Sequence, residues 1–445
     1  MNQTIHKLAQ SAGFLMAFLI GLPLPAQAAI DGINGGTSTT QTFNLTAKPG
    51  YISTGDGNSV YVWGYANGTG AMQYPGPTLI VKQGDKVVVN LSNNLPAGVS
   101  TSIIFPGQSQ VDATGGNAAG LVTKEVNPGN STVTYTFTAT EPGTYMYHSG
   151  TNQALQLDMG LVGTLIVRPK VADPLHQAYT HSGSAFTHEY LFLLSEMDPA
   201  FHAKVESDVL AGLTPSVDNL QHLSTLWFIN GRNGPDTMLD GKVSWLPNQP
   251  YNALARMHPG EKLLMRVINV GRDLHPFHTH GNNMLMIARD GRMLASSSSS
   301  GPDLATSNYT LQAVPGETYD LIYQWTGAGL NWDIYGHLPD ANGNLPPLEP
   351  FESEADHGKP FPQISPGVPL ALPNILDRFE GEGFSGSPFL GASESARPGQ
   401  VKLNRFGGYF HMWHSHAERE LTNDDIFPGG MLTMVIIEPH GVPIP

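Results

Sequence analysis

Residues 131–150 have the sequence STVTYTFTATEPGTYMYHSG. Polar and apolar residues alternate on both sides of Pro142 and Gly143, two residue types that together favour a turn. Alternation with a period of two is typical of a strand that buries one face of a sheet. The stretch therefore predicts two strands with a tight turn between them.

Strand-like runs continue on both sides of this stretch. The segment TLIVKQGDKVVVNLSNNLP (residues 78–96) contains two β-branched runs separated by Gly84 and Asp85, which is a hairpin signal. The segment GLVGTLIV (residues 160–167) is a further apolar strand. Residues 29–170 are therefore predicted to form one antiparallel β-sandwich.

A second series of strand-like runs occupies residues 171–445. The runs are HEYLFLLSEMD, STLWFINGR, KLLMRVINVGRD, NMLMIARDGRML, ETYDLIYQW, GGYFHMWHSH and GGMLTMVIIEP. A stretch at about 338–400 is rich in Pro, Gly and Ser and has little periodicity, so we interpret it as an insertion or lid. The fold class is expected to be all-β, with two sandwiches in tandem.

The composition supports this fold class and limits the kinds of partner. The 445 residues include 50 Gly and 35 Pro, and only 13% are charged, which suits turns and short strands better than a helical bundle. The formal net charge of -15 argues against nucleic acid or an anionic membrane surface as a partner. A small molecule or a metal ion is the expected substrate.

The N-terminus resembles a cleaved secretory signal. Lys7 precedes the apolar run GFLMAFLIGLPL (residues 13–24), and Ala26 and Ala28 then form a small-x-small cleavage site. The run is too short and too interrupted by Pro to span a bilayer, and no second run is long enough. Residues 1–28 are therefore predicted to be a signal peptide, and the mature protein is expected to be periplasmic or secreted, with no membrane span.

The chain contains no cysteine. This absence excludes disulfides, thiolate nucleophiles, iron–sulfur clusters and Cys-ligated zinc. Any metal must be held by His, carboxylate, Met or backbone oxygen.

Two His-x-His pairs among the 17 histidines indicate a metal site. The pairs are His278 with His280 and His414 with His416. Residues two apart on a strand point to the same face, so each pair can offer two imidazoles to one site. A single pair can arise by chance on a surface, but two pairs, each with a histidine three residues upstream (His275 and His411), favour metal binding.

Five segments resemble the multicopper oxidase family along most of the predicted mature chain. They are PGPTLIVKQGDKVVVNLSNNLP, TSIIFPG, GTYMYHSG, HPFHTHG and HMWHSH. The resemblance implies tandem cupredoxin-like Greek-key β-sandwiches. It also implies copper: in the active members, a type 1 copper takes electrons from substrate and a trinuclear cluster reduces dioxygen to water.

The resemblance also shows where this chain departs from the family pattern. Ile104, Pro106 and Gly150 stand at positions where the family has cluster histidines. The cluster positions that keep a histidine are His148, His278, His280, His414 and His416. A full trinuclear cluster is therefore in doubt, and we expect between one and three copper ions.

The type 1 copper position departs further. The resemblance places His275 and Met431 at two ligand positions, but Ser415 replaces the thiolate and Glu420 replaces the second histidine. Serine is normally protonated and poorly covalent, so no blue copper is expected. His275, Met431 and His411 remain further candidate ligands.

Three functions remain open from the sequence. The first is an oxidoreductase that uses a residual His-ligated copper site, the second is a non-catalytic copper-binding or copper-tolerance protein, and the third is a structural or interaction protein that kept the fold. Two-domain members of the family close their cluster between subunits, commonly in a ring of three. If His148 joins the other four histidines, a homotrimer is expected, unless the insertion lets both sandwiches close the site within one monomer.

Overall fold

The computed structural model describes residues 30–129, 131–239, 241–328, 333, 335, 337–359, 386–387, 409–438, 440 and 442–444. The predicted signal peptide and most of the predicted insertion, from residue 360 to residue 400 apart from 386–387, lie outside the described residues.

Residues 33–168 form a sandwich of two sheets, with a small ribbon of β8 (Ala118–Ala119) and β9 (Lys124–Glu125) beside it. In order across the first sheet, the strands are β1 (Ile33–Asn34), β5 (Leu79–Lys82), β12 (Val162–Arg168) and β11 (Gly143–His148). In order across the second sheet, they are β4 (Met72–Gln73), β3 (Ser59–Asn67), β2 (Thr40–Ser53), β6 (Lys86–Asn93), β10 (Thr132–Thr138) and β7 (Asp112–Gly115).

Residues 188–437 form a second sandwich. Its larger sheet runs β14 (Leu226–Ile229), β13 (His188–Met197), β16 (Lys262–Asn269), β22 (Thr318–Gln324), β18 (Met284–Arg289) and β19 (Arg292–Met293), with β20 (Thr306–Asn308) paired to β18. Its smaller sheet runs β15 (Ala255–Met257), β25 (Leu432–Ile437), β24 (Tyr409–Ser415), β17 (His275–Thr279) and β21 (Thr310–Ala313), with β23 (Gly386–Ser387) paired to β24.

Helices are few and short in the described part of the chain. They are α1 (Gln153–Gln156), α2 (Pro199–Leu210) and the 3-10 turns η1 (Ser182–Ser184), η2 (Asn219–Gln221), η3 (Asp236–Met238) and η5 (Glu418–Leu421). The Asp198 carboxylate caps α2 by accepting from the Ala200 amide at 2.8 Å, and Pro199 fits the first turn. No described helix has the length and apolar character needed to cross a membrane.

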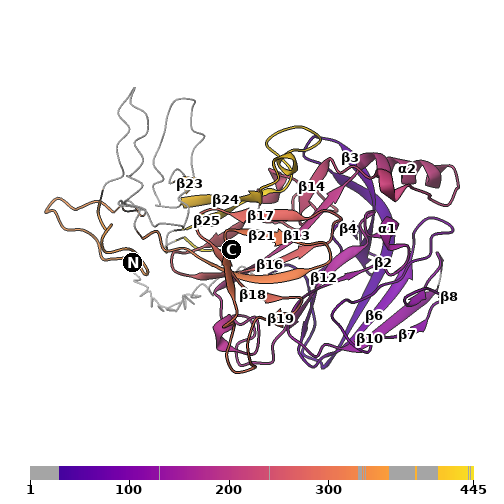
Figure 1. Cartoon of the computed structure of the whole chain (residues 1–445), viewed down its shortest axis with the longest axis horizontal. Coiled ribbons are helices and arrows are strands. Elements are labelled where there is room, and N and C mark those ends of the chain that lie inside the picture. The colour runs from indigo at the N-terminus through magenta and orange to yellow at the C-terminus, as the bar shows by residue number, and fades with distance from the viewer. Residues whose placement is uncertain are drawn as a thin grey trace, which may run out of the picture.

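The two sandwiches share one strand order. In the first, β2 pairs with β6 in parallel and β5 pairs with β12 in parallel. In the second, β13 pairs with β16 in parallel and β15 pairs with β25 in parallel, at the corresponding places. The predicted all-β class with sandwiches in tandem is confirmed, and Figure 1 shows the two sandwiches side by side.

A shared apolar layer and a buried ion network join the sandwiches. Met146 and Val162 of the first pack with Leu193 and Phe228 of the second. Beside this layer, Arg168 of the first sandwich donates to Glu189 of the second at 2.7 Å. Buried charges of opposite sign that meet in this way fix the relative position of the two sandwiches, because separating them would leave unpaired charge.

Strand β11 turns one face toward this junction. Tyr145 and Tyr147 lie in the core of the first sandwich. Thr144 instead donates to Asp320 of the second sandwich at 2.5 Å, and Met146 packs into the shared layer. His148 stands two residues after Met146, so the alternation of a strand places it on the same face as Met146.

Candidate metal centre

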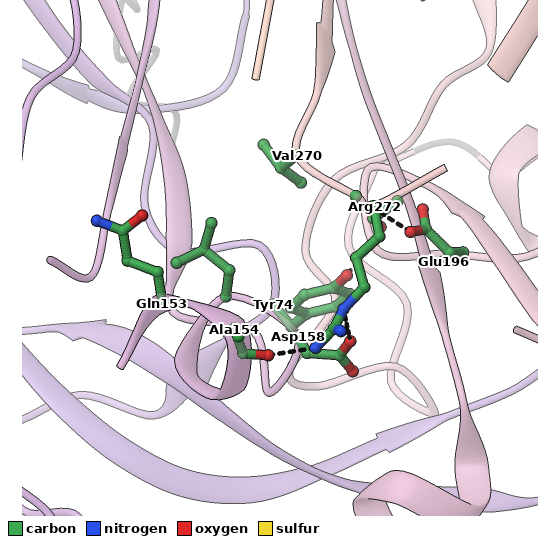
Figure 2. A pocket seen from close by; sticks show the side chains of 10 residues that line it. Tyr74, Gln153, Ala154, Asp158, Glu196, Val270 and Arg272 are labelled. Atoms are coloured by element: carbon green, nitrogen blue, oxygen red, sulfur yellow. Dashed lines mark hydrogen bonds and ion pairs between the residues drawn. The ribbon is translucent and has the colours of Figure 1, made fainter. Parts of the chain in front are cut away.

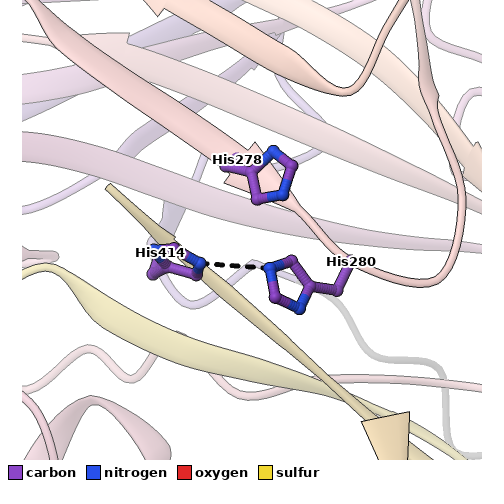
Figure 3. A group of neighbouring side chains, drawn as sticks. All are labelled: His278, His280 and His414. Carbon is purple, nitrogen blue, oxygen red and sulfur yellow. Dashed lines mark hydrogen bonds between the residues drawn. The ribbon is translucent and has the colours of Figure 1, made fainter. Parts of the chain in front are cut away.

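Three histidines of the second sandwich bring their ring nitrogens together on the outer face of one sheet. His278 of β17 stands opposite His414 of β24, and His280 follows the end of β17. The Nε2 atoms of His280 and His414 are 3.1 Å apart, and one nitrogen from each of the three rings lies within 4.8 Å of the others (Figure 3). Phe277 and Trp413 belong to the core, so the histidines beside them in sequence occupy the opposite face.

Neighbouring groups orient two of these rings and keep them neutral. The Nδ1 atom of His414 lies 2.6 Å from the carbonyl oxygen of Ser415, and Nδ1 of His278 lies 2.9 Å from the Thr310 hydroxyl. Burial lowers the pKa of both rings, and repulsion from His414 and His416 lowers the pKa of His278 further. A neutral imidazole with one nitrogen already engaged is the form that binds a metal through the other nitrogen.

His416 adds a fourth imidazole at the edge of this group. Its ring centroid is 5.0 Å from that of His278 and 5.8 Å from that of His414, and the side chain is exposed. The backbone N–H of His416 donates to the Pro276 carbonyl at 2.7 Å, which holds the residue beside β17. We call the four residues the histidine rim: His278, His280, His414 and His416.

His148 occupies the matching place in the first sandwich. It bridges Ile104 across the sheet, as His414 faces His278, and its Nδ1 lies 2.9 Å from the Ser149 carbonyl. Burial lowers the pKa of His148. The group of ligand nitrogens formed among the described residues of this chain contains His278, His280 and His414 and does not include His148.

His275 lies below the rim, in a buried corner that contains two carboxylates. Its Nδ1 is 2.9 Å from Glu420 and its Nε2 is 2.8 Å from Glu196, while the Ser415 hydroxyl donates to Glu420 at 2.6 Å. Burial alone would lower the pKa of His275, but the hydrogen bonds that its ring donates to Glu196 and Glu420, together with their negative charges, outweigh burial and raise the pKa to about 9. Both ring nitrogens are therefore engaged and the ring is charged at neutral pH. We call this group, which also includes the buried Met431, the charged corner.

His411 lies on the core side of β24. It points to the face of β24 opposite that of Met412 and His414. The side chain is fully buried, and its ring centroid is 5.4 Å from that of Trp325. It therefore faces away from the rim.

A cavity of about 260 Å³ opens next to the charged corner, at the junction of the sandwiches (Figure 2). Arg272 crosses it from the second sandwich and pairs with Asp158 of the first at 2.6 Å. The backbone N–H of Arg272 donates to Glu196, the same carboxylate that binds His275. Glu196 therefore belongs both to the charged corner and to the lining of the cavity.

Sequence reasoning did not identify Glu196 or Thr310. Glu196 is the second carboxylate on His275, and it lies in β13, a strand that is buried along nearly its whole length. A charged residue within a buried strand is a signal of a buried polar partner. Thr310 orients His278, and nothing in its local sequence signals that role.

Comparison with known proteins relates the first sandwich to one family. Residues 46–172 match the model of the multicopper oxidase family. The first sandwich contains a multicopper oxidase domain. The iron transport multicopper oxidase fetC of Epichloe festucae is 30% identical over 241 residues, which cover 52% of this chain and 33% of that protein. The L-ascorbate oxidase of Nicotiana tabacum is 24% identical over 387 residues, 79% of this chain and 61% of that protein.

Solved multicopper oxidases share the fold. The blue copper oxidase of Nitrosomonas europaea has a TM-score of 0.53 at 20% identity and covers 89% of this chain and 85% of that one. The multicopper oxidase mgLAC also has a TM-score of 0.53 at 20% identity. The sandwiches are therefore cupredoxin-like, as expected. The chain spans less than two thirds of the length of the two curated relatives above.

The match of residues 46–172 to the multicopper oxidase family implies copper binding, and the two candidate sites fit copper differently. The histidine rim offers neutral imidazoles on one face, a donor set that suits copper. The charged corner offers a hydroxyl, two carboxylates and a charged imidazole whose nitrogens are both engaged. Its donors do not fit a blue copper, which needs a thiolate.

Proposed function

We propose that this chain is an exported, copper-binding oxidoreductase of the multicopper oxidase type that works without a type 1 blue copper. The observation that carries the proposal is the convergence of three ring nitrogens within 4.8 Å on the outer face of the second sandwich, with His416 beside them. The apolar run at residues 13–24, followed by Ala26 and Ala28, supports export.

Bound copper would supply one-electron redox chemistry at the rim. The Ser415 carbonyl and the Thr310 hydroxyl each engage Nδ1 of one ring, His414 and His278 respectively, so that Nε2 of each ring would serve the metal. Four rim imidazoles, with His148 as a fifth, are enough for one to three copper ions. The exposed side of His416 leaves the rim open to solvent.

The charged corner explains why substrate must reach the rim directly. In the family pattern this place holds the type 1 copper that relays electrons from substrate to the cluster. Here Glu420, His275 and Glu196 form a continuous buried chain of hydrogen bonds in that place. We infer that electrons enter at the rim itself, from a small molecule or a metal ion.

We propose that the rim is completed in a homotrimer. The face of β11 that carries Met146 is covered by the second sandwich of the same chain. The equivalent face of β24 carries Met412 and His414, and Met412 is only partly buried. A contact that covers this face with another copy is head-to-tail, and such a contact repeats until a ring closes. His148 of a second copy would then be available to the rim.

A non-catalytic copper-binding function is the second candidate. The observation that favours it is the same filled corner, because a site without a relay can hold copper without turning over a substrate. The two functions differ in what the copper-loaded protein does with dioxygen.

Oxygen uptake distinguishes the two functions. The copper-loaded chain is mixed with Cu⁺, Fe²⁺ or a phenol as the electron donor. We expect uptake above that of free copper, and loss of this excess in His414→Gln. His176→Gln, which changes a partly exposed histidine outside the rim, is the control and should keep the activity. Bound copper with no excess uptake for any donor would favour the non-catalytic function.

Light scattering of the copper-loaded protein tests the assembly. We expect the mass of three chains, and weaker copper binding in His148→Gln. A monomer in which His148 is still required for copper would instead show that both sandwiches close the site within one chain.

A further inference from the structure

A second set of metal-binding side chains lies outside the rim, in the segment after β22. One ligand atom from each of its four residues lies within 4.8 Å of the other three. We call this set the loop cluster: Asp333, His337, Glu352 and His357. Two imidazoles and two carboxylates are a donor set that proteins use for zinc.

The separations in the loop cluster match the edges of a tetrahedron around a metal. The Nδ1 atom of His337 lies 3.0 Å from Asp333 and 3.2 Å from Glu352. The Nδ1 atom of His357 lies 2.7 Å from Glu352 and 3.8 Å from Asp333. Zinc bonds of about 2.0–2.1 Å to nitrogen and oxygen place tetrahedral ligands about 3.3 Å apart. The four observed distances lie around that value.

Hydrogen bonds within the loop cluster satisfy its buried carboxylates poorly. The side chains of Asp333 and Glu352 are 1% and 4% exposed, and among the described residues their ion-pair partners are His337 and His357. One Nδ1 carries at most one proton, yet Nδ1 of His337 is in contact with both carboxylates. A divalent cation would balance both negative charges and bind all four atoms at once.

The surrounding loop holds the ligand atoms in place. The second oxygen of Glu352 accepts from the Glu349 amide at 2.8 Å, which leaves the first oxygen for the cluster. Asp333 accepts from the Gly358 amide at 2.9 Å. Nε2 of His357 lies 2.9 Å from the Pro346 carbonyl, so its Nδ1 remains for the cluster. Ligands oriented in this way are typical of real metal sites.

From these contacts we propose that the loop cluster binds one Zn²⁺ ion. Four protein ligands with no open position are typical of a structural zinc site, and here the ion would join the start of the segment to its end. The site is separate from the rim. The ring centroid of Tyr335, in the same segment as the loop cluster, is 6.4 Å from that of His440. His440 follows β25 at the end that pairs with Tyr409, the first residue of β24. His414 lies five residues after Tyr409 along β24, which is about 16 Å from that end at 3.3 Å per residue.

Zinc titration of two matched variants of the full chain tests the proposal. The metal-free wild type, Glu352→Gln and Glu354→Gln are titrated with Zn²⁺ alone. Glu354 is exposed, two residues away and outside the loop cluster. Replacing an outer-shell partner weakens metal binding about 10- to 100-fold, so the loss of the ligand itself should raise one Kd by at least about 100-fold. Any other zinc site is the same in both variants, so its contribution cancels when the two titrations are compared.

We expect wild type and Glu354→Gln to bind one more tight Zn²⁺ than Glu352→Gln. Equal numbers and affinities in all three proteins would overturn the proposal.

A ligand exchange keeps the test decisive if Glu352→Gln does not fold. His357→Cys replaces one zinc ligand by another, in a chain that otherwise has no cysteine. With Co²⁺ in place of Zn²⁺, we expect a thiolate-to-cobalt charge-transfer band that the wild type lacks. A folded His357→Cys protein that takes up Co²⁺ without this band would contradict the assignment.

Discussion

The two sandwiches carry the same buried corner in two chemical versions. In the first sandwich, the Ser149 amide donates to the Leu161 carbonyl at 3.0 Å and the Leu161 amide donates to Gln156 at 2.9 Å. The Gln156 side chain then accepts from the hydroxyls of Ser149 at 2.6 Å and Thr101 at 2.9 Å. All these side chains are uncharged, so we call this group the neutral corner.

The charged corner repeats the same backbone bonds. The Ser415 amide donates to the Met431 carbonyl at 3.0 Å, and the Met431 amide donates to the Glu420 carbonyl at 2.7 Å. Glu420 takes the place of Gln156, and His275 takes the place of Thr101.

The two corners show that one cupredoxin frame accommodates either a neutral or an ionic set of side chains. The backbone bonds join three positions in each sandwich, and a side-chain hydrogen bond adds the fourth. The side chains decide whether the corner is neutral or ionic. The sheet face above each corner differs in the same way. The first sandwich has Ile104 beside His148, whereas the second has His278 beside His414.

The largest effect is expected from placing a charge in the neutral corner. Gln156→Glu would bury a carboxylate without the cation that Glu420 has in His275, and an uncompensated buried charge costs about 3–5 kcal/mol. Urea unfolding at pH 7 measures the loss. Gln153→Glu, on the exposed side of α1, is the matched control and should change the free energy of unfolding little. Equal losses in both variants would show that the corners do not differ in charge balance.

A pH-dependent effect is expected only from the charged corner. The folded pKa of His275 is raised to about 9 from 6.5, so its contribution is fully present below pH 6.5 and is lost as the pH rises through 9. A shift of this size corresponds to about 3 kcal/mol. We expect the free energy of unfolding of the wild type to fall over this range by more than that of Glu420→Gln.

The control for this pH series is Glu418→Gln, an exposed carboxylate in the same 3-10 turn. It should keep the pH dependence of the wild type. If Glu420→Gln and Glu418→Gln gave the same curve, Glu420 would not stabilise the charged form of His275.

The smallest effect is expected from exchanging the apolar residues of the corners. Leu161→Met gives the neutral corner the residue that Met431 supplies in the charged one. A Leu-to-Met exchange of similar volume costs less than about 1.5 kcal/mol, and the variant should gain no copper. Thermal unfolding and copper analysis check both points. A copper ion gained by Leu161→Met would mean that Thr101 and Gln156 can serve as ligands.

Local sequence patterns predicted much of the fold and part of the candidate site. Alternation in residues 131–150 predicted two strands, observed as β10 and β11, because burial of one face imposes a period of two. These two strands belong to different sheets, and so do β5 and β6, so the hairpin expected within residues 78–96 was wrong. The same period places His278 with His280 and His414 with His416 on one face of the sheet. Their meeting depends on the register of β17 against β24, which brings together residues more than 130 positions apart.

Long-range pairing limits what the sequence alone can predict. His275 binds Glu196 and Glu420, which lie 79 and 145 residues from it, and no local spacing signals either contact. Likewise, the segment after residue 338 shows little periodicity, yet its Glu352 and His357 meet Asp333 and His337 in the loop cluster. Irregular segments position side chains through turns and caps, which periodicity does not reveal.

The paramagnetic resonance spectrum of the Cu²⁺-loaded protein and two variants shows directly which of the two sites holds the copper. We propose that the histidine rim holds the copper and that the charged corner does not. We predict a spectrum of nitrogen-coordinated copper with no intense blue absorption, unchanged in His275→Gln and lost with the bound copper in the double variant His278→Gln/His414→Gln. Loss of the signal in His275→Gln, with full copper retained by the double variant, would contradict the account.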